Sequence, residues 1–149
     1  MDLRELYQEL IVDHSKQPRN FGPMPESNYC ADGFNPLCGD KIHLYLKVED
    51  NVIIGAGFEG SGCAISTASA SMMTEILKGR TIAQAKTLFE LFHSMVTGST
   101  ESNGGIDDFG KLAVFAGVKE YPARVKCATL AWHTLRNALL KRDESAKTE

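Results

Sequence analysis

Residues 41–58, KIHLYLKVEDNVIIGAGF, form the most regular hydrophobic pattern in this chain. In both halves of the stretch, apolar residues alternate with polar or small ones, which is typical of a β-strand buried on one face. The dipeptide Asp50-Asn51 between the halves favours a tight turn. The pattern therefore predicts an antiparallel hairpin, with Ile54 among the residues on the buried face of the second strand.

The position of the turn determines which residues of the hairpin face each other. Counting outward from the turn places Asp40 opposite Ser61 and Cys38 opposite Cys63. Directly opposed residues have Cβ atoms about 4.5–5.5 Å apart, close enough for two sulfurs to bind one zinc ion. A buried thiol contact or a disulfide is the alternative for this pair. The glycines of the second strand also allow a bulge, which would shift the pairing by one residue.

A second pattern precedes the hairpin, where residues 35–40 read NPLCGD. In an extended chain residues i and i+2 project to the same side, so Cys38 and Asp40 can reach one metal ion. Gly39 between them has no Cβ and leaves room for that ion. An ordinary turn is the alternative, because Asn-Pro and Gly-Asp are common turn dipeptides.

Two of the cysteines lie beside helical patterns. An apolar stripe over 65–76 predicts a helix that starts at or next to Cys63, where the helix dipole favours a thiolate. Cys127 precedes another apolar stripe and is expected near a helix start, with Arg124 and Lys126 adding positive charge beside it. A zinc site of three sulfurs and one oxygen is one possibility, formed by Cys38, Asp40, Cys63 and Cys127. For the run of alanines and serines after Cys63, close packing of the helix against the sheet is the alternative.

Further elements follow from periodicity and capping signals. Apolar residues at helical spacing predict an N-terminal helix that ends before Pro18, and residues 81–84, TIAQ, have the form of a capping box that begins another helix. A short strand pattern at 27–32 carries Cys30, which we interpret as structural. His14 is a candidate ligand, although capping or packing is the more frequent role of such a histidine.

The composition is that of one ordinary globular domain. At 149 residues, roughly two-thirds of the unfolded surface can be buried. A net charge of −3 and a pI near 5.8 argue against a nucleic-acid partner. The sequence has neither a signal-peptide pattern nor the roughly 20 consecutive apolar residues of a membrane helix. We expect no membrane partner, a domain at 1–142 and a frayed charged tail at 143–149.

The cysteine content indicates the chemistry of the chain. We expect a cytoplasmic protein, in which thiols stay reduced. The four cysteines are then metal ligands or reactive groups rather than disulfides. Their spacings match no CxxC-type finger, so any metal site must be assembled by the fold.

Three cysteine-centred motifs give the chain a specific resemblance. NPLCGD at 35–40, GSGCAISTASASMM at 60–73 and ARVKCATLAW at 123–132, with DHSKQPRNFG at 13–22, resemble the U-type iron–sulfur cluster assembly proteins and most closely their SufU-like branch. The resemblance implies a single α+β domain with a small three-stranded antiparallel sheet packed against several helices. It also implies one metal site, whose matching positions are Cys38, Asp40, Cys63 and Cys127.

Two features differ from the IscU scaffold branch of that family. That branch has a histidine immediately before its last cysteine and a Leu-Pro-Pro-Val-Lys chaperone motif. This chain has Lys126 before Cys127 and YPARV at 121–125. The missing double proline puts docking of the scaffold's chaperone in doubt. The segment from about 91 to 120 resembles an insertion of SufU-like members.

The resemblance implies a zinc-dependent acceptor and carrier of persulfide sulfur, which takes sulfur from a SufS-like cysteine desulfurase and passes it to downstream sulfur or cluster acceptors. Cys38 is the candidate sulfur acceptor, and Arg124 is a candidate contact for the partner or the sulfur. A second hypothesis is a scaffold on which a [2Fe–2S] cluster, or iron, is held by the same ligands. A third is a domain in which zinc only holds the fold.

Overall fold

The computed structural model describes residues 3–36, 39–98, 112, 115, 118, 122–140 and 146–147. Its elements are α1 (Leu3–Lys16), β1 (Tyr29–Asn35), β2 (Asp40–Glu49), β3 (Val52–Ser61), α2 (Ala64–Leu77), α3 (Ile82–Thr97), α5 (Pro122–Leu139) and β4 (Ala146–Lys147). Strands β1, β2 and β3 form an antiparallel sheet, and the two residues of β4 pair in parallel with the outer edge of β1. The predicted α+β class with a three-stranded antiparallel sheet is confirmed.

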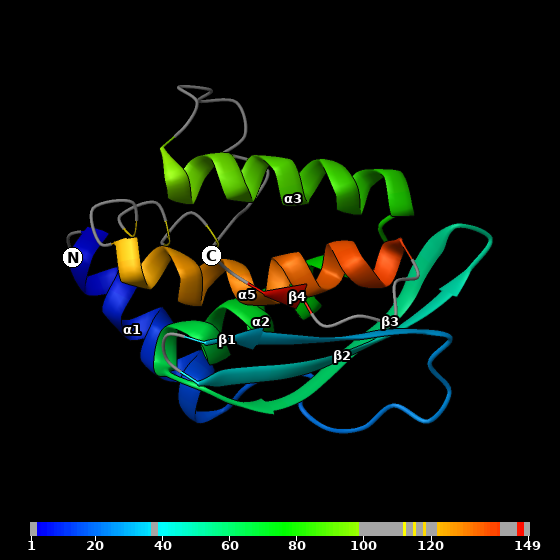
Figure 1. Ribbon diagram of the computed structural model, residues 1–149, viewed down its shortest axis with the longest axis horizontal. Coiled ribbons are helices and arrows are strands. Elements are labelled where there is room, and N and C mark those ends of the chain that lie inside the picture. The colour runs from blue at the N-terminus through cyan, green and yellow to red at the C-terminus, as the bar shows by residue number, and fades with distance from the viewer. Residues whose placement is uncertain are drawn as a thin grey trace.

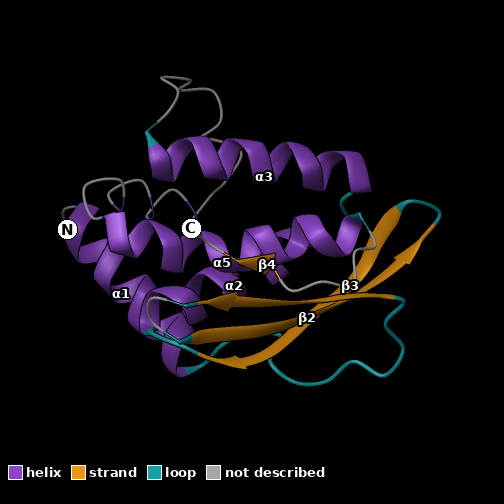
Figure 2. Cartoon of the chain, in the orientation of Figure 1, coloured by secondary structure: helices purple, strands orange, loops and turns teal. Residues whose placement is uncertain are grey.

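The helices lie on one face of the sheet in two layers (Figure 1, Figure 2). Helices α2 and α5 pack on the strands, α1 packs on α2, and α3 packs on the side of α5 that faces away from the sheet. The ring of Phe92 on α3 stacks on that of Trp132 on α5, with centroids 4.5 Å apart. No helix in the described part of the chain is long and apolar enough to cross a membrane. The core therefore lies between the sheet and the first helical layer and extends into the second.

The hairpin of β2 and β3 has the predicted turn. Asp50 and Asn51 both adopt left-handed backbone conformations, with φ of 51° and 65°. Two consecutive residues with positive φ are typical of the tight turns whose twist matches that of the strands. Glu49 pairs with Val52 directly beside the turn. The turn thus starts the hairpin in the expected register.

A bulge in β3 then changes that register. Val48 pairs with Ile53, but the next residue, Lys47, pairs with Gly55, so that Ile54 is an extra residue in its strand. The side chain of Ile54 is 50% exposed, whereas Ile53 is fully buried. The prediction that Ile54 faces the core was wrong, because the bulge exchanges the two faces of the strand at this point.

The bulge also determines what lies opposite Asp40. Ser61 pairs with Lys41, so the prediction that Ser61 faces Asp40 was wrong by one residue. The chain that leaves β3 therefore reaches Asp40 with the residues after Ser61. The predicted pairing of Cys38 with Cys63 lies outside the described residues, because Cys38 is not among them.

The outer edge of β3 is paired by loops. Phe58 donates its backbone N–H to Asn20 at 3.0 Å and accepts that of Gly22 at 2.8 Å. Ile53 donates its backbone N–H to the carbonyl of Arg80, and its own carbonyl accepts the N–H of Gly79, each at 2.8 Å. At the opposite edge of the sheet, β4 pairs with β1. Both edges of the sheet therefore have partners for part of their length.

Strand β1 lies later in the sequence than the predicted strand at 27–32. It begins at Tyr29, after Asn28, whose side-chain amide bonds both the N–H and the C=O of Val48 at 2.8 Å. This amide imitates a strand residue and continues the ladder by one position. Cys30 lies on β1 and is exposed on the face of the sheet away from the helices.

The starts of two helices test the predicted boundaries. Thr81 and Gln84 form both bonds of the capping box, which is confirmed. Helix α5 begins at Pro122, so the prediction that this helix follows Cys127 was wrong. Proline fits the first position of a helix, where no N–H donor is needed. Cys127 consequently lies in the second turn of α5 rather than at its start.

Two predicted features lie largely outside the described residues. Of the segment 91–120, the structure describes 91–98 and three buried residues, Leu112, Phe115 and Val118. Of the tail at 143–149, it describes β4 alone. The domain boundaries at 1–142 therefore stay a prediction.

A glycine allows α5 to lie close to the sheet. Gly33 faces inward from β1, and a Cβ at this position would overlap Oγ1 of Thr134 and lie 3.2 Å from Cδ1 of Leu130. Both of these residues belong to α5. The same helix carries Cys127, and the same strand ends at Asn35. The close approach at Gly33 therefore sets the distance between the two elements near these residues.

We expect Gly33→Ala to lower the free energy of unfolding by about 1–3 kcal/mol, because the added methyl group overpacks the contact between β1 and α5. Gly55→Ala is the matched control in the same sheet. Its Cβ would meet the flexible end of Met24 at 3.4 Å, so the change should be near zero. Urea unfolding of both variants measures the difference, and equal stability would show that the close approach does not constrain the fold.

Candidate metal centre

Asp40 is the first residue of β2, and its side chain is 2% exposed beneath the helices. Its Oδ1 accepts the backbone N–H of Cys63 at 3.0 Å, and its Oδ2 lies 3.9 Å from Sγ of Cys63. A buried carboxylate requires a hydrogen-bond donor or a cation. The backbone of Cys63 therefore holds one oxygen, while the other faces the thiol.

Cys63 is the N-cap residue of α2, which confirms the predicted helix start. Its φ of −70° and ψ of 170° are the extended values of a cap, and its Sγ accepts the N–H of Ser66 at 3.4 Å. Side chains with an oxygen acceptor, such as those of Ser, Thr, Asp and Asn, usually occupy the N-cap position. A sulfur in their place faces the free N–H groups and the positive end of the helix dipole, which favour a thiolate.

Cys127 is fully buried in the second turn of α5. The prediction of a helix-start position for this cysteine was therefore wrong, and Cys127 does not face the free N–H groups of a helix start. N–H groups in a helix interior are already bonded within the helix. The amide Nδ2 of Asn35, at the end of β1, lies 3.9 Å from Sγ of Cys127.

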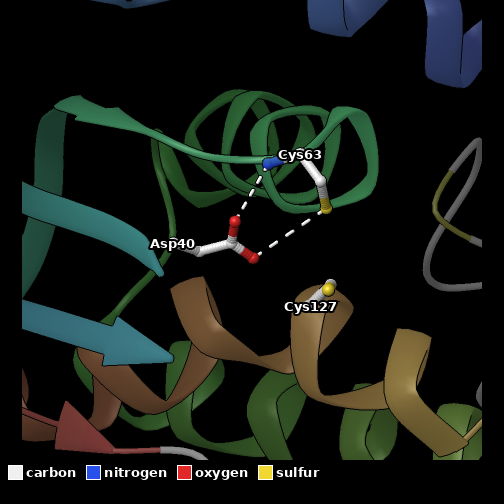
Figure 3. A group of neighbouring side chains, drawn as sticks. All are labelled: Asp40, Cys63 and Cys127. Atoms are coloured by element: carbon white, nitrogen blue, oxygen red, sulfur yellow. Dashed lines mark hydrogen bonds between the residues drawn. The ribbon is translucent and has the colours of Figure 1, made fainter. Parts of the chain in front are cut away.

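Figure 3 shows that the side chains of Asp40, Cys63 and Cys127 converge, although they come from β2, the start of α2 and α5. One carboxylate oxygen and the two sulfurs all lie within 4.8 Å of one another. Among the described residues, no other group of three histidine, cysteine or acidic side chains is this close. The fold thus assembles three potential ligands from positions that are far apart in sequence.

Gly62 makes room for this arrangement. A Cβ at this position would lie 2.9 Å from Oδ1 and 3.1 Å from Cγ of Asp40, and 3.2 Å from Oγ of Ser66. Any side chain here would push the carboxylate away from the N–H of Cys63. In the sequence Gly62 indicates only a possible bulge, because the neighbour that excludes a side chain, Asp40, belongs to another strand.

The three groups fit a zinc ion. Zinc binds thiolates at about 2.3 Å and carboxylate oxygens at about 2.0–2.2 Å in a tetrahedron. Such ligand atoms are roughly 3.5–3.8 Å apart, so a set within 4.8 Å needs only small side-chain movements. Thiolates also suit iron–sulfur clusters. A fourth position remains for another ligand.

The thiol of Cys63 is acidic. Its hydrogen bond with Cys127 lowers the pKa of Cys63 to about 6, and the N–H groups of Ser66 and Ile65 act in the same direction. Burial and the charge of Asp40 oppose this effect. The lowered pKa favours the thiolate form of Cys63, which is the form that binds metals.

Two further predicted site residues lie close in sequence to residues of this centre, Cys38 near Asp40 and Arg124 near Cys127. Cys38 lies outside the described residues, two positions before Asp40. The next residue, Gly39, has a left-handed φ of 74°, and its N–H donates to the carbonyl of Asn35 at 2.8 Å. Arg124 is exposed in the first turn of α5. It precedes Cys127 by three residues, the spacing of neighbours on a helix surface.

Two other candidates do not join the centre. Cys30 is exposed on the opposite face of the sheet. His14 is fully buried between α1 and α2, with Nδ1 2.7 Å from Oγ of Ser71 and Nε2 3.7 Å from Oε1 of Glu75. His14 thus packs two helices together, which was the alternative to a ligand role.

Family comparison identifies the kind of chain that carries this centre. The family described as NifU-like N terminal domain matches residues 6–140. The zinc-dependent sulfurtransferase SufU of Bacillus subtilis (strain 168) is 42% identical over 142 residues, which are 95% of each chain. The iron-sulfur cluster assembly scaffold protein IscU of Streptococcus pyogenes serotype M1 is 39% identical over 145 residues, or 97% of this chain and 89% of that protein.

Solved structures share the fold. A crystal structure from Fervidobacterium islandicum AW-1, named for an iron-sulfur cluster assembly scaffold protein of the SUF system, has a TM-score of 0.83 and 36% sequence identity. The similarity covers 91% of this chain and 97% of that one. A second crystal structure, of a hypothetical protein, has a TM-score of 0.84 at 38% identity over 91% of this chain and 98% of the other.

The acidity of Cys63 can be measured by its rate of alkylation in metal-free protein. We expect the rate to rise with pH around a midpoint near 6, because the thiolate is the reactive form. In Cys127→Ala the midpoint should move to higher pH, since the largest cause of the lowered pKa is lost. Mass spectrometry after iodoacetamide treatment reports each cysteine separately, with exposed Cys30 as the internal reference. An unchanged midpoint in Cys127→Ala would contradict the role of this hydrogen bond.

Proposed function

Because this chain belongs to the family of the NifU-like N-terminal domain, we propose that it is an iron–sulfur cluster assembly protein that accepts persulfide sulfur from a cysteine desulfurase and carries it onward. We propose a zinc ion as its resident cofactor. Asp40, Cys63 and Cys127 would hold this ion. Cys38 would be both the fourth ligand and the sulfur acceptor.

One observation carries this proposal, the convergence of Asp40, Cys63 and Cys127 within 4.8 Å. Two thiols and a carboxylate are a chemically suitable set for zinc, and two of the three residues, Asp40 and Cys127, are buried. The similarity to a protein named as a zinc-dependent sulfurtransferase supports the same choice of metal.

When bound, zinc would keep its cysteine ligands in the thiolate form and fix their positions. The chain's own residues then have separate tasks. Asp40 is held by the N–H of Cys63 and stays in place beside the thiols. Cys63 and Cys127 are anchored in two helices. Cys38 belongs to the connection between β1 and β2, so its movement would not require a helix to move.

The sulfur transfer itself is an exchange between thiolate and persulfide. The thiolate of Cys38 attacks the outer sulfur of the desulfurase persulfide, so that one sulfur–sulfur bond forms and one breaks. The bonding electron pair leaves with the desulfurase cysteine, which becomes a thiolate. No external oxidant or reductant is needed, since the sulfane sulfur changes its partner without a net change of oxidation state. Delivery to a downstream acceptor would repeat the exchange with a new thiolate.

The partner is proposed to be a SufS-like desulfurase. Arg124 is exposed on α5 close to the centre in sequence, and its guanidinium is suited to contact an anionic group of the partner or the persulfide. The reducing cytoplasm is the proposed compartment, because this exchange requires free thiols.

A scaffold role is the second candidate, in which the same residues hold a [2Fe–2S] cluster as cargo. The IscU of Streptococcus pyogenes, which is named as a scaffold, is nearly as similar to this chain as SufU is. Lys126, where the scaffold branch has a histidine beside its last cysteine, favours the carrier. A purely structural zinc remains the third candidate, and the activity of a cysteine desulfurase separates it from the other two.

Protein purified without added iron should contain about one zinc per chain. In the double variant Cys63→Ser, Cys127→Ser zinc should be lost, because two of its proposed ligands are removed. Cys30→Ser is the control and should keep the full amount. Elemental analysis tests all three proteins. Undiminished zinc in the double variant, or loss of zinc in Cys30→Ser, would show that the ligand assignment is wrong.

Cys38→Ser should separate metal binding from sulfur transfer. We expect it to retain zinc with lower affinity, because three protein ligands and water form a known type of zinc site. It should not raise the turnover of the desulfurase, since a serine hydroxyl at neutral pH is a poor acceptor of sulfane sulfur. Alanine production from cysteine by the desulfurase measures turnover, and mass spectrometry detects added sulfur on Cys38.

The outcomes differ between the three candidates. Equal stimulation by wild type and Cys38→Ser, without added sulfur on Cys38, would exclude the carrier. A scaffold would instead show its defect in the retention of an assembled cluster. A structural zinc site would leave desulfurase turnover unaffected by either protein.

A further inference from the structure

Two of the converging groups at the metal centre have a backbone N–H donor. Oδ1 of Asp40 accepts the N–H of Cys63 at 3.0 Å. Sγ of Cys63 accepts the N–H of Ser66 at 3.4 Å. Hydrogen bonds to negatively charged acceptors are stronger than bonds between neutral groups. Both donors come from the start of α2, where N–H groups are free of helix bonds.

Cys127 lacks this source of donors because of its place in α5. It lies in the second turn, where the backbone N–H groups bond carbonyls of the same helix. It is also more deeply buried than Cys63, and a buried thiolate needs compensation at least as much as a partly exposed one. A side chain from another element can supply an N–H donor to this sulfur instead.

Asn35 is placed to do so. Its side chain is fully buried, and its Nδ2 lies 3.9 Å from Sγ of Cys127, within reach of a hydrogen bond to sulfur. A thiolate only accepts hydrogen bonds, so the NH₂ group of the amide and not its carbonyl must face it.

The backbone of Asn35 also has defined partners. Asn35 pairs with Asp40 at the end of the β1–β2 ladder, and its carbonyl accepts the N–H of Gly39 at 2.8 Å. The residue therefore lies at one end of the 36–38 connection and touches a sulfur on α5. This arrangement exceeds what an Asn-Pro turn requires, because a turn uses the backbone of its first residue and does not need that side chain to reach a helix.

We propose that Asn35 is a positioning residue of the metal centre, which donates an N–H bond to the sulfur of Cys127 and orients that sulfur toward Asp40 and Cys63. This inference rests on the proposed function, since it assigns Asn35 to a centre whose ligands are Asp40, Cys63 and Cys127. Donors outside the ligand shell orient ligands and tune their charge, and their loss typically lowers metal affinity by about 10–100-fold.

The test uses the full chain with zinc and with cobalt(II) as a spectroscopic replacement. Asn35→Leu removes the donor at similar volume. It should lower zinc affinity about 10–100-fold in competition with a chelator. It should also move the sulfur-to-cobalt charge-transfer band to longer wavelength, because a sulfur without its hydrogen bond gives up electrons more easily. Asn137→Leu is the matched control, since Asn137 is also buried but lies about 15 Å further along α5.

A second variant covers the case in which Asn35→Leu does not fold. Asn35→Asp keeps the shape of the side chain but replaces the NH₂ donor by a carboxylate oxygen. It should lower zinc affinity more than Asn35→Leu does, because the new negative charge faces a thiolate. Both variants should retain one zinc per chain at high zinc concentration.

Each outcome bears on one inference. Wild-type affinity and an unmoved band in the folded variants would overturn the role of Asn35 and leave the proposed function intact. Weaker zinc binding with an unmoved band would also overturn the role of Asn35, since this combination indicates only a general loss of stability. An effect of the same size in Asn137→Leu would overturn that role too. Failure of the wild-type protein to bind zinc would defeat the proposed function instead.

Discussion

Three groups that can carry negative charge converge within 4.8 Å beneath the helices, and two of them, Asp40 and Cys127, are buried. Like charges at such distances repel, and each loses its hydration on burial. N–H donors that face the groups offset this cost, and a cation bound between them would offset it further. Much of the local structure serves this requirement. The capping position of Cys63, the missing side chain at Gly62 and the buried amide of Asn35 each place a donor, or leave space for one.

The protein meets this requirement with elements that are rigid for other reasons. Asp40 starts a strand in the middle of the sheet, and Cys127 is fixed in a helix that packs on both the sheet and α3. Cys63 is the cap of a helix and would be held there without any metal. Cys38 lies between Asn35 and Asp40 in the sequence. In the proposed function, Asp40, Cys63 and Cys127 hold the metal while Cys38 takes part in the chemistry.

The sequence predicts the parts of this structure that depend on local patterns. The alternation around Asp50-Asn51 predicts the hairpin and its turn, and the stripe after Cys63 predicts the start of α2. The bulge at Ile54 could not be located, because four glycines allow it at different positions and the choice depends on packing against β2. The true start of α5 was also missed, since the apolar stripe after Cys127 is stronger than the signal from Pro122.

The same distinction applies to the candidate site. The cysteines and Asp40 stand out in the sequence by residue type, and the cysteine motifs predict their common site. The supporting residues do not stand out. Asn35 is interpreted as an ordinary turn residue until the structure brings it to α5, 92 positions later in the chain. Ser66 is one serine among several in α2, and only its distance from the cap gives it a role. Residues whose role depends on a contact in the folded chain, and not on a sequence motif, can therefore be identified only from the structure.

The pairing of the sheet edges affects how the protein behaves at high concentration. An edge strand with free N–H and C=O groups can recruit a strand from another molecule and start aggregation. Here the loop at 20–22 and the turn at 79–80 bond to β3, and β4 bonds to β1. The bulge at Ile54 also twists the β3 edge, which makes it a poorer template for another strand. A protein with the proposed role of bringing sulfur to other proteins can therefore meet them repeatedly without joining their strands to its own sheet.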